Sequence, residues 1–99
     1  MSGLHVDAAA MNMNGRETVA AAEDFGRELA SLRNNVEGLM SVWSGLSASE
    51  FNKNYERQAQ NLQGVQQLLT ELGMAISKSA SILSQTEEDN ATTGRNLFC

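Results

Sequence analysis

The chain has 99 residues, a length that suits one domain, and 41% of them are hydrophobic. Twelve acidic residues outnumber seven Lys and Arg, and the resulting formal charge of -5 disfavours nucleic acid or an anionic bilayer surface as a partner. The longest unbroken apolar runs, such as residues 8–11, are far shorter than a transmembrane helix requires, so we expect a soluble protein.

The N-terminal segment does not have the features of a secretory leader. No Lys or Arg precedes Arg16, and no apolar stretch of signal-peptide length is present. His5 is the single histidine, so one chain cannot assemble a histidine-based triad or a multi-histidine metal site. Since phosphate-loop and nucleophile-elbow motifs are also missing, we expect no enzymatic activity, no metal and no cofactor.

A first long helix is predicted over residues 7–42, approximately. Proline is absent from the chain, and residues that favour helices dominate it. Asp7 could cap the start, while Asn14 and Glu17 form a rival capping box; the earlier start is favoured. The apolar residues alternate steps of four and three, as in a coiled-coil seam. They are Phe25, Leu29, Leu32, Val36, Leu39 and Trp43.

A turn is predicted at residues 43–46. Gly45 can adopt a positive φ after a helix, and Ser47 with Glu50 has the spacing of a capping box. If Ser47 is the cap, Leu46 and Phe51 have the spacing of a hydrophobic staple. These signals together predict a helix-turn-helix connection.

A second helix is predicted over residues 47–89, approximately, with a flexible tail at residues 90–99. The acidic residues at 87–89 should fray the last turns, because the C-terminal end of the helix dipole is already negative. Cys99 is the single cysteine, so no internal disulfide can form, and we expect a terminal thiol without a role. The apolar stripe is Phe51, Tyr55, Ala59, Leu62, Val65, Leu69, Leu72, Ile76, Ser79 and Leu83.

The short connection predicts an all-α fold, an antiparallel two-helix hairpin. Leu68, Ala75 and Ile82 broaden the apolar face beyond one seam. Four glycines inside the helices, at positions 26, 38, 64 and 73, each cost about 1 kcal/mol relative to Ala, and burial against a second hairpin would offset this cost. We therefore expect the hairpin to dimerise into a four-helix bundle. The expected seam and interface residues are Phe25, Leu29, Leu32, Val36, Leu39, Leu62, Val65, Leu68, Leu69, Leu72 and Ile76.

The tripeptide Trp43, Ser44, Gly45 lies between the two predicted helices. In a proline-free chain of this length it resembles the signature turn of the WXG family of small type VII secretion substrates, which includes the early secreted antigen proteins of mycobacteria. The resemblance covers nearly the whole chain. It implies a hairpin that pairs as a homodimer, or as a heterodimer with a related protein, and leaves the cell folded without a cleaved signal peptide. The apolar seams carry no charge, which favours the homodimer.

The family often carries an export motif after the second helix, a Tyr followed by an acidic residue four positions later. The nearest match here is Leu83 with Glu87, in which Leu replaces the Tyr. The resemblance implies a looser version of this signal or a partner chain that carries the full motif. The physical alternative is that Leu83 is a last seam residue and residues 87–89 are a solvated acidic end.

The resemblance therefore implies a secreted, non-enzymatic interaction protein that a type VII (ESX) secretion system exports as a folded dimer. Its implied partners are itself or a related WXG protein and the type VII ATPase, and its implied place is outside a bacterial cell or on its surface. One alternative is a membrane-perturbing, pore-forming or lytic virulence effector, whose helices would insert when acid neutralises their carboxylates. Another is a cytosolic adaptor that binds a partner helix in its groove.

Overall fold

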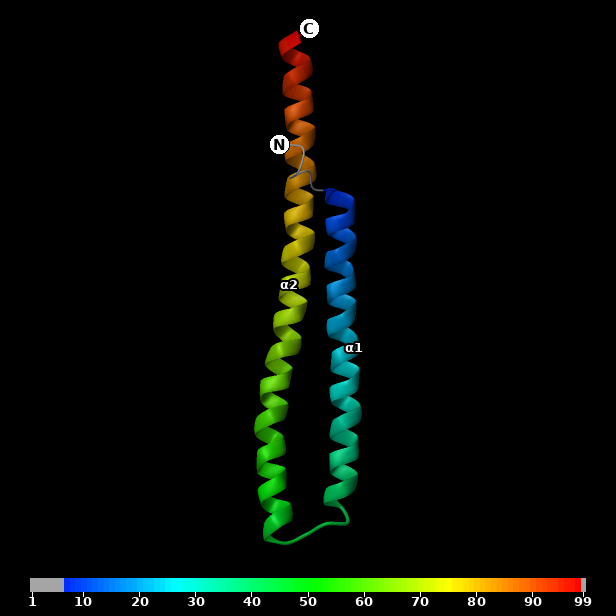
Figure 1. Cartoon of the computed structure of the whole chain (residues 1–99), viewed down its shortest axis with the longest axis vertical. Helices are drawn as coiled ribbons and strands as arrows, with labels where there is room; N and C mark the ends of the chain where they lie inside the picture. Colours follow the sequence, from blue (N-terminus) through cyan, green and yellow to red (C-terminus); the bar gives the residue numbers. More distant parts are fainter. Residues whose placement is uncertain (1–6, 99) are drawn as a thin grey trace.

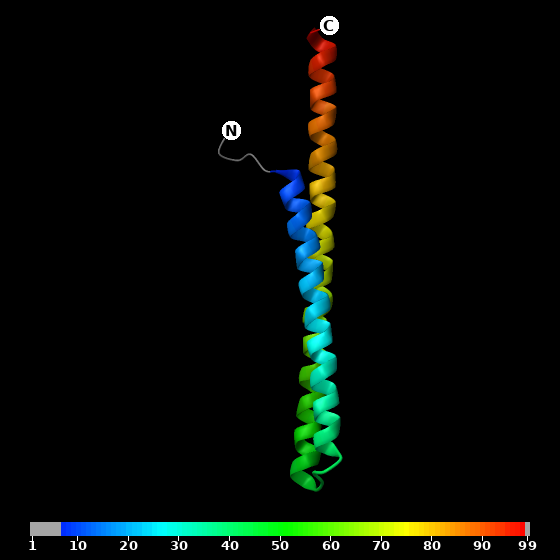
Figure 2. The ribbon, with the colours of Figure 1, turned by 90° about the vertical axis from the view of Figure 1, so that its right-hand side faces the viewer.

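The fold is a hairpin of two long helices. The computed structural model describes residues 7–98, with side chains described for residues 7–86. Helices α1 (Ala8–Met40) and α2 (Leu46–Phe98) run antiparallel and side by side (Figure 1, Figure 2). No strand occurs among residues 7–98. The prediction of an all-α, antiparallel two-helix hairpin is confirmed.

Helix α1 begins at the earlier of the two predicted starts. The Asp7 carboxylate accepts hydrogen bonds from the backbone N–H groups of Ala9, at 2.9 Å, and Ala10, at 3.3 Å. The Asp7 carbonyl accepts the first helical bond from the Met11 N–H at 3.0 Å. Asp7 is therefore the N-cap residue, since its side chain satisfies donors that the first helical turn leaves without partners.

The connection between the helices spans residues 41–45 and is displaced toward the N-terminus from the predicted turn at 43–46. Gly45 adopts the expected positive φ, at 102°. Its carbonyl accepts a hydrogen bond from the Ser49 N–H at 3.1 Å, so Gly45 occupies the cap position of α2. The helix thus begins two residues earlier than a Ser47 cap predicts, and Leu46 lies within its first turn, 80% exposed, rather than before the cap.

Helix α2 also ends later than expected. The sequence predicted an end near residue 89 and a tail at 90–99, whereas α2 continues to Phe98. No proline interrupts this segment, and its single Gly94 costs only about 1 kcal/mol relative to Ala, which is not enough to end the helix. Helix α2 therefore extends well past the beginning of α1, as Figure 1 shows.

Small side chains form the contact between α1 and α2. The buried apolar residues are Ala22, Val36, Ala48, Ala59 and Ala80. The helices come close together where Gly15 faces Gly73, since a Cβ built on Gly73 would lie only 2.7 Å from the Gly15 carbonyl oxygen. Such narrow contacts leave little room to bury larger apolar side chains between the two helices.

The hairpin is long and thin. Its principal-axis extents are 81, 21 and 16 Å, and its radius of gyration is 22.7 Å. A compact chain of this length has a radius of gyration of about 13 Å. Neither helix, within the residues described, has a stretch both long and apolar enough to cross a bilayer. An elongated hairpin has a large surface for its mass, and the distribution of apolar residues on that surface determines what it can bind.

Candidate interaction surface

The hairpin has two flanks, one on each side of the contact between α1 and α2. The two flanks carry different kinds of side chain. Buried or closely packed residues mark the contact positions: Ala22, Gly26, Arg33 and Val36 on α1, and Ala59, Gln66, Gly73 and Ala80 on α2. Successive helical residues are rotated by about 100°, so the residue before a contact position and the residue after it lie on opposite sides of the contact. Because the helices are antiparallel, preceding residues from both helices share one side.

Glu28, which precedes the half-buried Leu29, is a charged residue on the flank of preceding residues, and the others described there are uncharged. These uncharged residues are Ala21, Phe25, Leu32 and Asn35 on α1, and Gln58, Val65, Leu72 and Ser79 on α2. Leu39 and Leu68 extend the same side along α1 and α2, respectively. We call Phe25, Leu32, Leu39, Val65, Leu68 and Leu72 the apolar flank. All of these except Phe25, which is half-buried, are exposed in the single hairpin.

The flank of following residues is polar. It contains Glu23, Arg27, Asn34 and Glu37 on α1, and Gln60, Gln67, Met74 and Ser81 on α2. Arg27 forms an ion pair with Asp24, one turn before it, and the Gln67 amide donates a hydrogen bond to Glu71 at 3.4 Å. Met74 is the large apolar residue of this set. The hairpin is therefore two-faced, with a mostly apolar side on which Glu28 is the charged residue and a mostly polar side that carries several charges.

The structure divides the expected seam between a helix contact and an open surface. Val36 is buried, and Phe25, Leu29, Leu62, Leu69 and Ile76 are half-buried. Leu32, Leu39, Val65, Leu68 and Leu72 are exposed. The sequence pattern did not identify Gly15 as a contact residue. Its spacing of seven residues before Ala22 is the signal that could have identified it.

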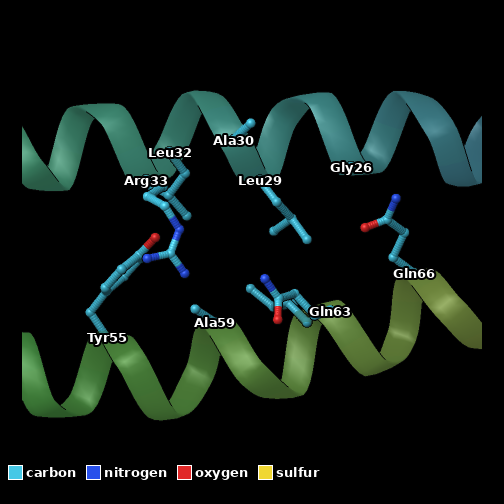
Figure 3. Close-up of a pocket in the computed structure, with 10 residues that line it drawn as sticks. Gly26, Leu29, Ala30, Leu32, Arg33, Tyr55, Ala59, Gln63 and Gln66 are labelled. Atoms are coloured by element: carbon cyan, nitrogen blue, oxygen red, sulfur yellow. The ribbon is translucent and has the colours of Figure 1, made fainter.

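A shallow hollow of about 180 Å³ lies between the helices midway along the hairpin. Figure 3 shows Arg33 reaching from α1 toward Tyr55, and Gln66 reaching from α2 toward Gly26. The Arg33 guanidinium carbon lies 5.9 Å from the centre of the Tyr55 ring, and Arg33 Nη1 lies 3.6 Å from Glu56 Oε1. These partners are half exposed, so the ion pair adds at most about 1 kcal/mol. The hollow is smaller than the roughly 300–1,000 Å³ of typical ligand pockets.

The tryptophan of the turn packs onto the second helix. The Trp43 ring is half-buried, and its centroid lies 5.5 Å from that of Phe51, with an angle of 47° between the ring planes. This is within the range of favourable aromatic pairs. Ser44 is exposed, and Gly45 supplies the backbone conformation that returns the chain toward α1. The three residues therefore form a structural unit that closes one end of the hairpin.

The remaining expected site residues lie toward the other end. Leu83 is half-buried, whereas the side chain of Glu87 lies outside the described part of α2. His5 and Cys99 also lie outside the described residues. Among the side chains that are described, no group of three or more His, Cys, Asp or Glu could hold a metal ion.

The sequence model of WXG100, described as proteins of 100 residues with WXG, matches residues 3–88. The structure is similar to EsxA of Geobacillus thermodenitrificans (crystal form I), with a TM-score of 0.80, 22% sequence identity, and coverage of 91% of this chain and 99% of that one. A search of curated proteins finds no significant match. At this identity the structural likeness establishes the hairpin fold, and the family match covers most of the sequence; the chain belongs to the WXG100 family.

Proposed function

We propose that this chain is a type VII (ESX) secretion substrate, a non-enzymatic interaction protein that leaves a bacterial cell as a folded dimer without a cleaved signal peptide. The observation that carries the proposal is the WXG100 match over residues 3–88. The Trp43 to Gly45 turn supports it, because this tripeptide closes the hairpin at the place that the family signature requires.

The two-faced hairpin supports a role in association with other proteins. Exposed large apolar residues gather on one flank, as expected for a surface that a partner covers. A dimer that covers this flank would leave the polar flank in contact with water. The described features thus favour a protein that works through its surfaces.

Deleting the type VII ATPase in the source bacterium tests the export. We expect the chain to disappear from the culture medium and to accumulate in cells, as measured by immunoblotting of both fractions. A cytosolic marker controls for lysis, and a protein exported by the general pathway controls for overall secretion. An unchanged extracellular level would refute export by this system. Confinement to the cells of the wild-type strain would favour the cytosolic adaptor instead.

The export signal is a separate proposal within this function. Leu83 and Glu87 stand four residues apart on α2, one turn along the same side of the helix. We expect Leu83→Ala and Glu87→Gln to lower the extracellular level several-fold, whereas Ser84→Ala leaves it unchanged. If both substitutions leave export unchanged, residues 83–87 are not the signal, and the ATPase deletion still decides the proposed function.

A further inference from the structure

Asn14 is the asparagine of the sequence that a glycine, Gly15, directly follows. The side-chain amide of an asparagine can be attacked by the backbone nitrogen of the next residue, and a glycine leaves that nitrogen unshielded because it has no side chain. We infer that Asn14 is a deamidation site controlled by the fold. The reaction proceeds when the start of α1 separates from α2, and its isoaspartate product prevents the contact from forming again.

The reaction consumes one water and releases one ammonia. The Gly15 nitrogen forms a bond to Asn14 Cγ and loses its proton, while the side-chain nitrogen leaves as ammonia and a succinimide ring remains. Water then opens the ring at one of its two carbonyl carbons. Attack at Cγ gives aspartate. Attack at the main-chain carbonyl carbon gives isoaspartate, in which the chain continues through Cβ and Cγ and is one carbon longer.

The closed hairpin blocks this attack because Gly15 is held on two sides. As a helical residue, Gly15 donates its N–H to the carbonyl of Met11, four residues earlier. The Asn14 carbonyl accepts a hydrogen bond from the Thr18 hydroxyl at 2.9 Å. Gly15 is also buried, and a Cβ built on it would lie 2.7 Å from the Gly73 carbonyl oxygen. The attack requires the peptide between Asn14 and Gly15 to rotate out of its helical orientation, so it requires α1 to leave α2 there.

The start of α1 is held weakly enough to open. Small and polar side chains surround a hollow of about 450 Å³ between the two helices there. They include Ala8, Ala9 and Asn12 on α1, and Ala80, Ser81 and Ser84 on α2. None of these side chains is large and apolar, and segments with few buried apolar contacts open with the smallest free energies. Opening of residues 8–15 frees the Gly15 nitrogen while the rest of α1 stays helical.

The two products differ in their effect on the helix contact. Asn14 is exposed, so an ordinary aspartate at this position places its added charge in water. Isoaspartate instead lengthens the main chain directly before Gly15, where the helices come closest, and the Gly73 carbonyl oxygen leaves no room for the shift. The first turns of α1 then stay apart from α2. Deamidation thus converts a reversible opening into a permanent one.

Asp7 provides the variants for the test, because its side chain caps the segment that opens. Asp7→Ala removes the cap and should raise the open population by about fivefold, whereas Asp7→Asn keeps a capping side chain. Ala20→Gly is the control for global unfolding. Ala20 is exposed on α1 beyond the segment that opens, and Gly there weakens the helix by a similar amount.

Peptide mapping by mass spectrometry measures the deamidation rate of Asn14 in mildly alkaline buffer. We expect the folded wild-type chain to react at least about tenfold more slowly than the chain unfolded in urea. Asp7→Ala should react about fivefold faster than the wild type, with Asp7→Asn and Ala20→Gly near the wild-type rate. Equal rates in the folded and unfolded chains, no acceleration by Asp7→Ala, or equal acceleration by Asp7→Ala and Ala20→Gly would each overturn the inference.

Hydrogen exchange of the separated isoaspartate form tests the effect on the contact. The amides of residues 11–15 should lose protection in this form. Asn14→Asp is the matched control, since it carries the same added charge on an unaltered main chain and should keep the protection. Wild-type protection in the isoaspartate form would refute the permanent opening. These measurements use the purified chain alone, so their outcome is independent of the proposed export.

Discussion

At the scale of single residues, the glycines within the helices have opposite roles. A Cβ on Gly73 would lie 2.7 Å from both the Gly15 carbonyl oxygen and Val19 Cγ2, and the backbone oxygen has little freedom to move. A Cβ on Gly64 would meet no atom within 4 Å. Gly73 is thus required by the close approach of the helices, whereas Gly64 has no such role within the hairpin.

We therefore predict opposite effects of Ala at these two positions. Gly64→Ala should stabilise the protein by up to about 1 kcal/mol, because Ala has the higher helix propensity. Gly73→Ala should destabilise it by about 1–3 kcal/mol, since overpacking at the contact outweighs that gain. Urea unfolding followed by circular dichroism measures both free energies. Stabilisation by both substitutions would contradict the close Gly15–Gly73 contact.

The small residues explain what the sequence could not predict about individual side chains. The alternating steps of four and three located the apolar face of each helix, but they did not determine which part of that face meets the other helix. Ala22 and Ala59 are buried at the contact, whereas Leu32 and Leu72 remain exposed beside it. Large apolar side chains dominate the periodic pattern in the sequence, whereas small side chains allow the two helices to approach each other closely. The periodicity alone therefore cannot predict which of these residues face the other helix, because rotating each helix by part of a turn changes them while the pattern stays the same.

At the scale of elements, the turn depends on an aromatic contact and one backbone conformation. We predict that Trp43→Ala and Phe51→Ala each destabilise the hairpin and that the double variant loses less than the sum. The rings are 5.5 Å apart, and such pairs couple by about 0.5–1.5 kcal/mol. A double-mutant cycle of urea unfolding measures the coupling. Strict additivity would show that the ring contact does not contribute.

The ends of α2 show why element boundaries were harder to predict than the elements. Near the turn, Ser47 and Glu50 matched a capping box, but the positive φ of Gly45 allows the helix to begin earlier. Toward the C-terminus, the acidic residues 87–89 predicted that the helix ends near residue 89, but α2 continues to Phe98. Both signals are worth about 1 kcal/mol, so neighbouring residues can override either of them.

The end of α2 beyond α1 leads to a further prediction. The first residues of α1, Ala8 and Ala9, lie beside Ser84 and Gln85, so the helix after these positions has no part of α1 opposite it. Removing residues 90–99 should change the unfolding free energy by less than about 0.5 kcal/mol, as for other sites away from a core. Truncation before Ala80, which is buried, should destabilise the hairpin markedly. If removing residues 90–99 lowers the unfolding free energy by more than about 1 kcal/mol, these residues pack against another part of the protein.

At the scale of the whole molecule, association should be visible in thermal stability. If folding is linked to pairing, the unfolding midpoint rises with protein concentration by mass action. We predict that the midpoint of the wild-type chain increases by several degrees between about 2 and 200 µM. The midpoint of Leu68→Asp should vary much less over the same range. A wild-type midpoint that is independent of concentration would show that unfolding is not coupled to dissociation.

The slender shape also has a consequence for transport. With a length of 81 Å and a cross-section of 21 by 16 Å, the hairpin can pass lengthwise through an opening that would block it broadside. For the proposed export, a conduit that carries the folded protein, as one hairpin or as two side by side, must therefore orient it lengthwise before passage. The two tips are chemically different, since one is the tryptophan bend and the other is the projecting end of α2 (Figure 2). Whichever tip is recognised first sets the direction in which the rod travels.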